Sequence, residues 1–221
     1  MLGNLFIVAT PIGNLEDITL RALRILKEVD IIIAEDTRVS GHLLKYYEIF
    51  RPTLSYHQHS GEEKKLQIMN FLLDGKNIAL VTDAGTPGIS DPGNELIDYL
   101  LSYQPDLKII PIPGASAITT ALSASGFTAN EFVFIGFMPK KKKTKLVKWL
   151  KVGEMTFAFY ESPHRLTKTL KQVEEEFGNV NVFIGRELTK MHETLYRGKI
   201  GDVIKKLSGK IKGEVVVVVE V

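Results

Sequence analysis

Cysteine is absent from the 221-residue chain, and its absence excludes disulfide bonds, thiolate metal sites and cysteine nucleophiles. Long apolar runs are absent as well, because no stretch reaches the roughly 20 residues that a membrane-spanning helix needs. The lack of thiols suits a reducing compartment, and we expect a cytoplasmic protein that does not enter a membrane. No two histidines stand at ligand spacing on a predicted helix. His57 and His59 could share a strand face, but we expect no metal site.

Positive charge is scarce in the first half of the chain and abundant in the second. Residues 1–113 carry 10 Lys and Arg against 15 Asp and Glu, whereas residues 114–221 carry 18 against 11. The formal net charge of +2 therefore hides an acidic half and a basic half. Such asymmetry predicts two domains, 1–113 and 114–221, with different partners.

Short apolar runs alternate with segments of helical periodicity. The predicted strands are 5–10, 31–37, 77–82, 108–113, 131–137, 155–161, 181–185, 194–198 and 214–220. The predicted helices are 19–29, 40–47, 62–73, 94–103, 115–125, 144–151 and 163–177. In residues 1–113 this alternation predicts an α/β layer with a mostly parallel sheet, and the chain as a whole is predicted to form two α/β domains.

Local signals add detail to three of these elements. Thr19 is the predicted N-cap of the first helix, and Leu20 and Leu26 belong to its expected apolar face. Pro163 is expected at the first position of the last helix, where a missing N–H costs nothing. The run EVVVVVE at 214–220 is apolar at successive positions, which predicts a central strand covered on both faces.

A loop rich in glycine, DAGTPGISDPG at 83–93, follows one of the apolar strands. It has neither the lysine of a P-loop nor the G-x-G-x-x-G spacing of a dinucleotide fold, and its aspartates would repel a pyrophosphate. An acidic loop that exposes backbone suits a positively charged ligand, and S-adenosylmethionine, a sulfonium, is such a ligand. Asp83 and Gly85 are therefore candidate cofactor contacts. The alternative is a simple turn, which is the usual role of Gly and Pro loops.

Seven motifs occur in order across nearly the whole chain: TPIGNLEDIT, AEDTR, DAGTPGISDPG, PGASA, FYESPHR, RELTKMHE and GEVVVVVE. Together they resemble the small-subunit ribosomal RNA methyltransferases of the tetrapyrrole methylase superfamily. The resemblance implies a homodimer of two-domain α/β chains, with S-adenosylmethionine bound between the domains. It also implies methylation of the ribose 2′-hydroxyl of a cytidine in the decoding region of 16S ribosomal RNA.

The same resemblance implies which residues contact the cofactor. In relatives the glycine loop meets the methionine part, and further contacts come from segments after other strands. Carried over to this chain, the expected contacts are Pro11, Thr86, Ile89, Ser116, Ala117, Phe159, Leu188 and Gly213.

Charged residues gather directly after the predicted strands. Ligands of open α/β sheets bind beyond the carboxyl ends of the strands, so a site is expected there. A base or a cation at this edge would assist methyl transfer to a hydroxyl group. The catalytic candidates are Asp36, Arg38, Glu161, Arg165, Glu187 and Lys190. Each could equally belong to an ion pair that fixes the two domains.

A lysine cluster, PKKKKTKLVKWLK, lies in the basic half. Lysines crowded at a helix N-terminus oppose the helix dipole unless an anion lies nearby. We expect Lys140, Lys141, Lys142 and Lys143 to contact the RNA backbone, with Trp149 and Phe137 available for stacking. The alternative is a solvated charged loop.

Two other functions are compatible with these motifs. One is methylation of a small tetrapyrrole, although such a substrate needs a cavity rather than an exposed basic strip. The other is a non-catalytic RNA-binding module that keeps the fold. The expected partner is small-subunit ribosomal RNA or the assembled small subunit.

Overall fold

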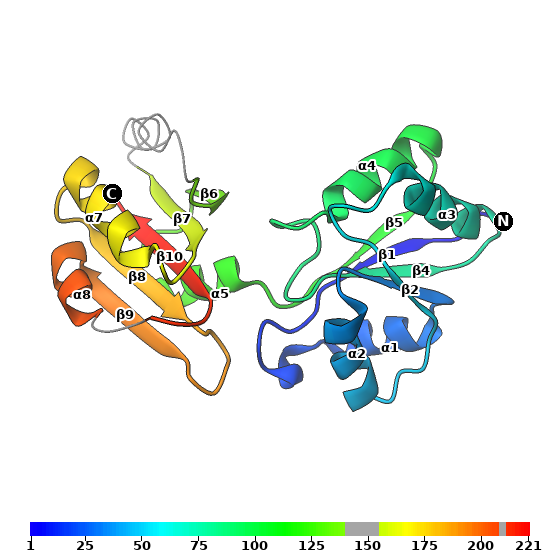
Figure 1. Cartoon of the computed structure of the whole chain (residues 1–221), viewed down its shortest axis with the longest axis horizontal. Helices are drawn as coiled ribbons and strands as arrows, with labels where there is room; N and C mark the ends of the chain where they lie inside the picture. The colour runs from blue at the N-terminus through cyan, green and yellow to red at the C-terminus, as the bar shows by residue number, and fades with distance from the viewer. Residues whose placement is uncertain (140–154, 208–210) are drawn as a thin grey trace. The chain divides into compact units, whose positions relative to one another are not determined.

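The computed structural model describes residues 1–139, 155–207 and 211–221 (Figure 1). The chain divides into two compact units, Met1–Ser116 and Ala117–Val221. The expected domain boundary at 113 lies in the segment between β5 (Ile109–Ile112) and α5 (Ala117–Ser125). The predicted helix at 144–151 and the lysines at 140–143 lie outside the described residues.

The first unit is built on a five-stranded sheet in the order β3-β2-β4-β1-β5, and all its neighbouring strands are parallel. Its strands are β1 (Leu5–Val8), β2 (Ile31–Ala34), β3 (Thr53–Ser55), β4 (Ile78–Val81) and β5. The parallel sheet predicted from the alternating pattern is thus confirmed for this half. β2 and β4 are buried at every position, as expected of parallel strands covered on both faces.

Helices cover both faces of this sheet (Figure 1). α1 (Leu20–Glu28) and α2 (Thr37–Tyr46) pack on one face, where they meet Val8, Ile32 and Val81. α3 (Glu62–Leu73) and α4 (Gly93–Tyr103) pack on the other, against Ile7 and Leu80. The two faces alternate along each strand because successive side chains point to opposite sides of a sheet.

The first helix begins as predicted but buries less than predicted. Thr19 is the N-cap of α1, and its side chain accepts a hydrogen bond from the Ala22 backbone N–H at 3.0 Å. Leu26 is completely buried, whereas Leu20 is 86% exposed. The assignment of Leu20 to the apolar face is therefore wrong. Leu20 is the first residue of α1, and its side chain lies beyond the part of the helix that the sheet covers.

The second unit has a different sheet, with the order β6-β7-β10-β8-β9. Its strands are β6 (Phe132–Phe137), β7 (Thr156–Glu161), β8 (Asn181–Arg186), β9 (Thr194–Lys199) and β10 (Val215–Glu220). Among the described strands of this sheet, β6 and β7 pair in parallel and the other neighbours pair antiparallel, a direction that the sequence analysis left open for this half. The short loop from β8 to β9 explains part of this, because a parallel pair needs a longer crossover. The prediction that 214–220 forms a central, covered strand is confirmed by β10.

Helices cover this sheet unequally. α7 (Leu166–Phe177) and α8 (Ile200–Lys206) share one core with the sheet. The sequence predicted a helix at 163–177 but none at the position of α8. α5 packs on β10 and β8. Pro163 is not the first residue of α7, contrary to expectation, because the chain makes a turn from Ser162 to Arg165 before the helix starts. The described part of the chain contains no helix long and apolar enough to cross a membrane.

The contrast between Leu26 and Leu20 gives a stability test. We expect Leu26→Ala to lower the free energy of unfolding by about 2–5 kcal/mol, because it leaves a cavity beneath α1. The matched control Leu20→Ala removes an exposed side chain from the same helix and should change it by less than about 0.5 kcal/mol. Urea unfolding followed by circular dichroism measures both. Equal losses would contradict the packing of α1.

Candidate functional site

The loops after β1 and β4 meet at the carboxyl ends of two neighbouring strands. The chain leaves β1 toward α1 on one face of the sheet and leaves β4 toward α4 on the other, so this is a topological switch point. Thr10 and Gly85 pair there through two backbone hydrogen bonds, with N···O distances of 2.9 and 3.1 Å. The Thr10 hydroxyl also donates to the Thr82 carbonyl at 3.1 Å. Open α/β sheets bind ligands at such points.

Gly85 allows three loops to come together at this point. Its φ is +86°, and a Cβ on it would lie 3.3 Å from the Ile12 Cγ2 and 3.6 Å from the Ala115 carbonyl oxygen. The Thr86 hydroxyl donates to the same Ala115 carbonyl at 3.1 Å. Pro11 is buried in this contact region. The loops after β1, β4 and β5 therefore join here largely through backbone.

The rest of the glycine loop is held in a fixed shape. One oxygen of Asp91 accepts hydrogen bonds from the backbone N–H groups of Gly88, at 2.7 Å, and Gly93, at 2.9 Å. Asn94 donates to the Gly88 carbonyl at 2.7 Å. Ile89, between these anchors, is 45% exposed. The loop is thus rigid, and it presents an apolar side chain next to its glycines.

Carboxylates accumulate beside the switch point. Asp83 accepts a hydrogen bond from the Asp36 backbone N–H at 3.0 Å, and Glu35 accepts one from the Thr82 hydroxyl at 2.8 Å. Burial, together with the nearby charges of Glu35 and Asp36, raises the pKa of Asp83. These groups repel a phosphate and attract a cation. This edge therefore suits a cationic ligand, as the composition of the loop predicted.

Asp36 and Arg38 form an ion pair at the start of α2. Asp36 is the N-cap of the helix, and its carboxylate binds both the backbone and the guanidinium of Arg38, with an Nη2–Oδ2 distance of 2.6 Å. The hydrogen bonds from Arg38 lower the pKa of Asp36 to about 2. The Arg38 side chain is 88% exposed. It can therefore meet an external anion without leaving Asp36.

In the second unit, one end of the sheet gathers the other charged candidates. Glu161 is 2% exposed and accepts hydrogen bonds from the Thr169 hydroxyl, at 2.6 Å, and the Ser162 backbone, at 2.7 Å. It also pairs with Arg165, which donates to the Met138 carbonyl at 3.1 Å. In the described part of the chain, the buried Nη1 of Arg165 has no hydrogen-bond partner. The pair ties the end of β7 to α7.

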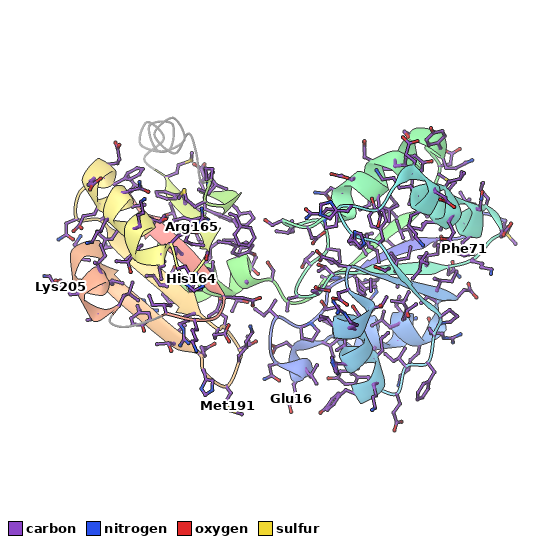
Figure 2. The ribbon with its side chains drawn as sticks, in the orientation of Figure 1. Glu16, Phe71, His164, Arg165, Met191 and Lys205 are labelled. Carbon is purple, nitrogen blue, oxygen red and sulfur yellow. The ribbon has the colours of Figure 1, made fainter. Side chains whose placement is uncertain are left out.

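Glu187, Lys190 and Glu214 form a second cluster at the same end of the sheet. Lys190 Nζ lies 3.0 Å from Glu187 and 2.9 Å from Glu214, and Glu187 also accepts from the Glu214 backbone N–H at 2.8 Å. That backbone contact and Lys190 lower the pKa of Glu187. Burial alone would lower the pKa of Lys190, but its two carboxylate partners raise it. Figure 2 shows Met191 at the tip of the loop that this cluster anchors.

The Glu187 cluster requires a glycine at position 213. Gly213 has φ of +93°, and a Cβ on it would lie 2.5 Å from the Glu187 carboxyl carbon. Leu188 is buried, and it packs so closely on Gly185 that a Cβ there would lie 2.7 Å from it. Gly213, Glu187 and Leu188, which the motifs singled out separately, are thus neighbours in the structure.

Phe159 does not offer its side chain to a ligand. It is completely buried in the core beneath α7, so any contact it makes would be through its backbone. The neighbouring Tyr160 points to the opposite face, where its ring contacts Phe134 and Phe137. Burial raises the pKa of Tyr160, and the Ile118 backbone N–H donates to its hydroxyl oxygen. Tyr160 therefore adjoins the start of α5. The sequence analysis did not single out Tyr160, although strand alternation places it on the face opposite to Phe159.

Comparison with known proteins agrees with this geometry. The model of the tetrapyrrole (corrin/porphyrin) methylases matches residues 4–204. The chain belongs to the tetrapyrrole methylase family. The family resemblance inferred from the seven motifs is thereby confirmed, and so is the two-part α/β fold.

Similar proteins share the sequence over nearly the whole chain. A Thermotoga maritima protein named ribosomal RNA small subunit methyltransferase I is 44% identical over 219 residues, which is 98% of each chain. A protein of the same name from Halalkalibacterium halodurans is 46% identical over 99% of this chain and 76% of its own.

The structure of uroporphyrin-III C-methyltransferase from Thermus thermophilus with S-adenosylhomocysteine has a TM-score of 0.68 at 16% identity. It covers 98% of this chain and 97% of its own.

This tetrapyrrole methylase is therefore a methyltransferase whose cofactor is S-adenosylmethionine. The residues at the switch point fit that cofactor. Gly85 lets the loops after β1, β4 and β5 meet at this point, and the carboxylates of Glu35, Asp36 and Asp83 beside it favour a sulfonium.

The close approach of Gly213 and Glu187 generates a matched test. We expect Gly213→Ala to lower the free energy of unfolding by about 2 kcal/mol more than Gly126→Ala, because only the former forces a side chain aside. Gly126 has φ of +75° with nothing within 4 Å of a Cβ, so the control isolates the backbone strain. Thermal unfolding measures both. An equal cost for the two variants would show that Glu187 does not occupy this place.

Proposed function

We propose that this tetrapyrrole methylase transfers a methyl group from S-adenosylmethionine to the ribose 2′-hydroxyl of a cytidine in the decoding region of 16S ribosomal RNA. The observation that carries the proposal is identity of 44% and 46%, over nearly the whole chain, to two proteins named ribosomal RNA small subunit methyltransferase I. The substrate is proposed as ribosomal RNA or the assembled small subunit. A homodimer in the cytoplasm is proposed as the working form.

The proposed cofactor contacts come from the glycine loop, the neighbouring strand ends and the Glu187 cluster. They are Pro11, Asp83, Gly85, Thr86, Ile89, Ser116, Ala117, Phe159, Leu188 and Gly213, to which Tyr160 is added. Phe159 would act through its backbone because its side chain is buried. Asp83 would attract the sulfonium, and Gly85 would let the cofactor approach the backbone closely.

The bound cofactor supplies a methyl group that is already activated by its positive sulfur. A bond forms between the ribose oxygen and the methyl carbon as the sulfur–carbon bond breaks, and the hydroxyl proton must leave. Rate enhancement can therefore come largely from positioning, with help for the departing proton and the developing negative charge. The protein's own charged groups at the strand ends are proposed to give this help.

The six charged candidates form three ion pairs, which differ in how far their side chains are exposed. Arg38 is exposed and oriented by Asp36, so this pair is proposed to meet the substrate. Glu161 is buried, with both oxygens engaged, so Glu161 and Arg165 are proposed as positioning residues at the end of β7. Glu187 packs closely on Gly213 and pairs with Lys190, so Glu187 and Lys190 are proposed as positioning residues as well. Lys140 to Lys143, outside the described residues, are proposed to contact RNA phosphates.

Methylation of a small tetrapyrrole is the first alternative. The likeness to uroporphyrin-III C-methyltransferase is at 16% identity and speaks only for the fold. A non-catalytic RNA-binding module is the second alternative.

Incorporation of tritiated methyl from S-adenosylmethionine tests the proposal. The acceptors are small ribosomal subunits purified from cells that lack this protein, and the matched control is subunits from cells that contain it. We expect label only in the first, because the second are already methylated. The label should survive protease, disappear with ribonuclease and map to a 2′-O-methylcytidine. Cofactor binding without label in subunits or free RNA would contradict the proposal and favour the alternatives.

A further inference from the structure

The segment after β3, residues His57–Ser60, forms a turn closed by its own hydrogen bonds. The Ser60 hydroxyl accepts from the His57 backbone N–H at 2.9 Å, and the His57 carbonyl accepts from the Ser60 N–H at 2.8 Å. The His59 backbone N–H donates to His57 Nδ1 at 3.2 Å. The two histidines therefore lie on a turn. They do not share a strand face, which the sequence had left possible. The side chains of His57, Gln58 and His59 remain exposed.

This turn lies at the same edge of the sheet as the switch point. β3 runs parallel to β2, with Ser55 opposite Ala34, so the carboxyl ends of both strands meet at one edge. The Tyr56 N–H donates to the Ala34 carbonyl at 2.9 Å, and the Ser55 hydroxyl donates to the Glu35 carbonyl at 3.3 Å. The turn is therefore joined directly to the segment that carries Asp36 and Arg38.

Charge decides what such a turn can bind. Residues 1–113 carry 15 acidic against 10 basic residues, and carboxylates stand at the switch point itself, so this edge disfavours a phosphate except beside the exposed Arg38. The turn HQHS contains no carboxylate, and it offers two imidazole rings and an amide, with Gln58 Nε2 3.3 Å from His59 Nε2. Because His57 Nδ1 accepts a hydrogen bond, a neutral His57 ring carries its proton on Nε2, which can act as a donor. Rings and amides of this kind stack on nucleobases and hydrogen-bond to their edges.

We infer that the His57–Ser60 turn contacts a nucleobase next to the nucleotide that is methylated. The turn thereby contributes to recognition of the RNA sequence. Contacts to RNA phosphates, made elsewhere on the chain, contribute affinity. This inference rests on the proposed function, because it takes RNA as the substrate. Its ligand is an unpaired base of that RNA.

The test compares substitutions on the turn with substitutions on neighbouring helices. Gln58→Ala and His59→Ala keep the two hydrogen bonds between His57 and Ser60, so the turn should stay closed. The matched controls are His42→Ala on α2 and Gln67→Ala on α3, both exposed. The assay is methylation of small subunits at saturating S-adenosylmethionine, over a range of salt concentrations. S-adenosylmethionine binding and thermal unfolding are measured for every variant.

We expect Gln58→Ala and His59→Ala together to raise KM for subunits about tenfold, as loss of a base contact does, with cofactor binding unchanged. The slope of log KM against log salt should stay that of the unsubstituted protein, because no phosphate contact is lost. Discrimination against subunits altered in the bases flanking the target should weaken. The control variants should change none of these.

Three results would overturn the inference. They are an unchanged KM and discrimination, an equal effect from the control variants, and a reduced salt slope, which would mean that the turn binds phosphate. Failure of the proposed function is a separate outcome, because the unsubstituted protein would then not methylate subunits at all.

Discussion

The backbone pair between Thr10 and Gly85 holds together the functional edge of the first unit. It joins the loops of two strands that send the chain to opposite faces of the sheet. Gly85 can form the pair only because it tolerates a left-handed backbone in contact with two other loops. Asp83 lies two residues before Gly85, and its carboxylate accepts the hydrogen bond from the Asp36 N–H that joins the two acidic segments of this edge.

In the second unit, side-chain ion pairs instead of a backbone pair fix the candidate edge. The sheet is mainly antiparallel, and the end where β7 finishes is fixed by ion pairs that include Glu161, Arg165, Glu187 and Lys190. These groups were catalytic candidates in the sequence, and the structure shows them as partners of one another. Breaking a buried pair leaves a charge without compensation, so such pairs specify a local arrangement strongly. Their contribution to catalysis is therefore proposed to be indirect.

Features that depend on neighbours in sequence were predictable, and features that depend on distant partners were not. The Thr19 cap, the strands and the central position of β10 follow from local patterns. The antiparallel pairing in the second unit could not be predicted, because an apolar run does not record which strand it meets. The burial of Phe159 could not be predicted for a similar reason, since strand alternation shows that Phe159 and Tyr160 face opposite ways without showing which of the two is covered.

The candidate site shows the same limit. The acidic, glycine-rich composition of 83–93 predicted a cationic ligand, and the cofactor S-adenosylmethionine is a cation; contact between the two stays a prediction. The sequence could not show that Asp91 serves to hold the loop, or that Glu187 requires Gly213. Those relations arise from contacts that form only on folding.

The most direct test of the account is the binding of S-adenosylmethionine and S-adenosylhomocysteine to Asp83→Asn, measured by calorimetry. The substitution keeps an oxygen for the Asp36 N–H and removes the charge. The account predicts weaker binding of the cationic S-adenosylmethionine and nearly unchanged binding of the product, which lacks the sulfonium charge. An equal loss for both ligands, or no loss for either, would contradict the view that this edge recognises a cation.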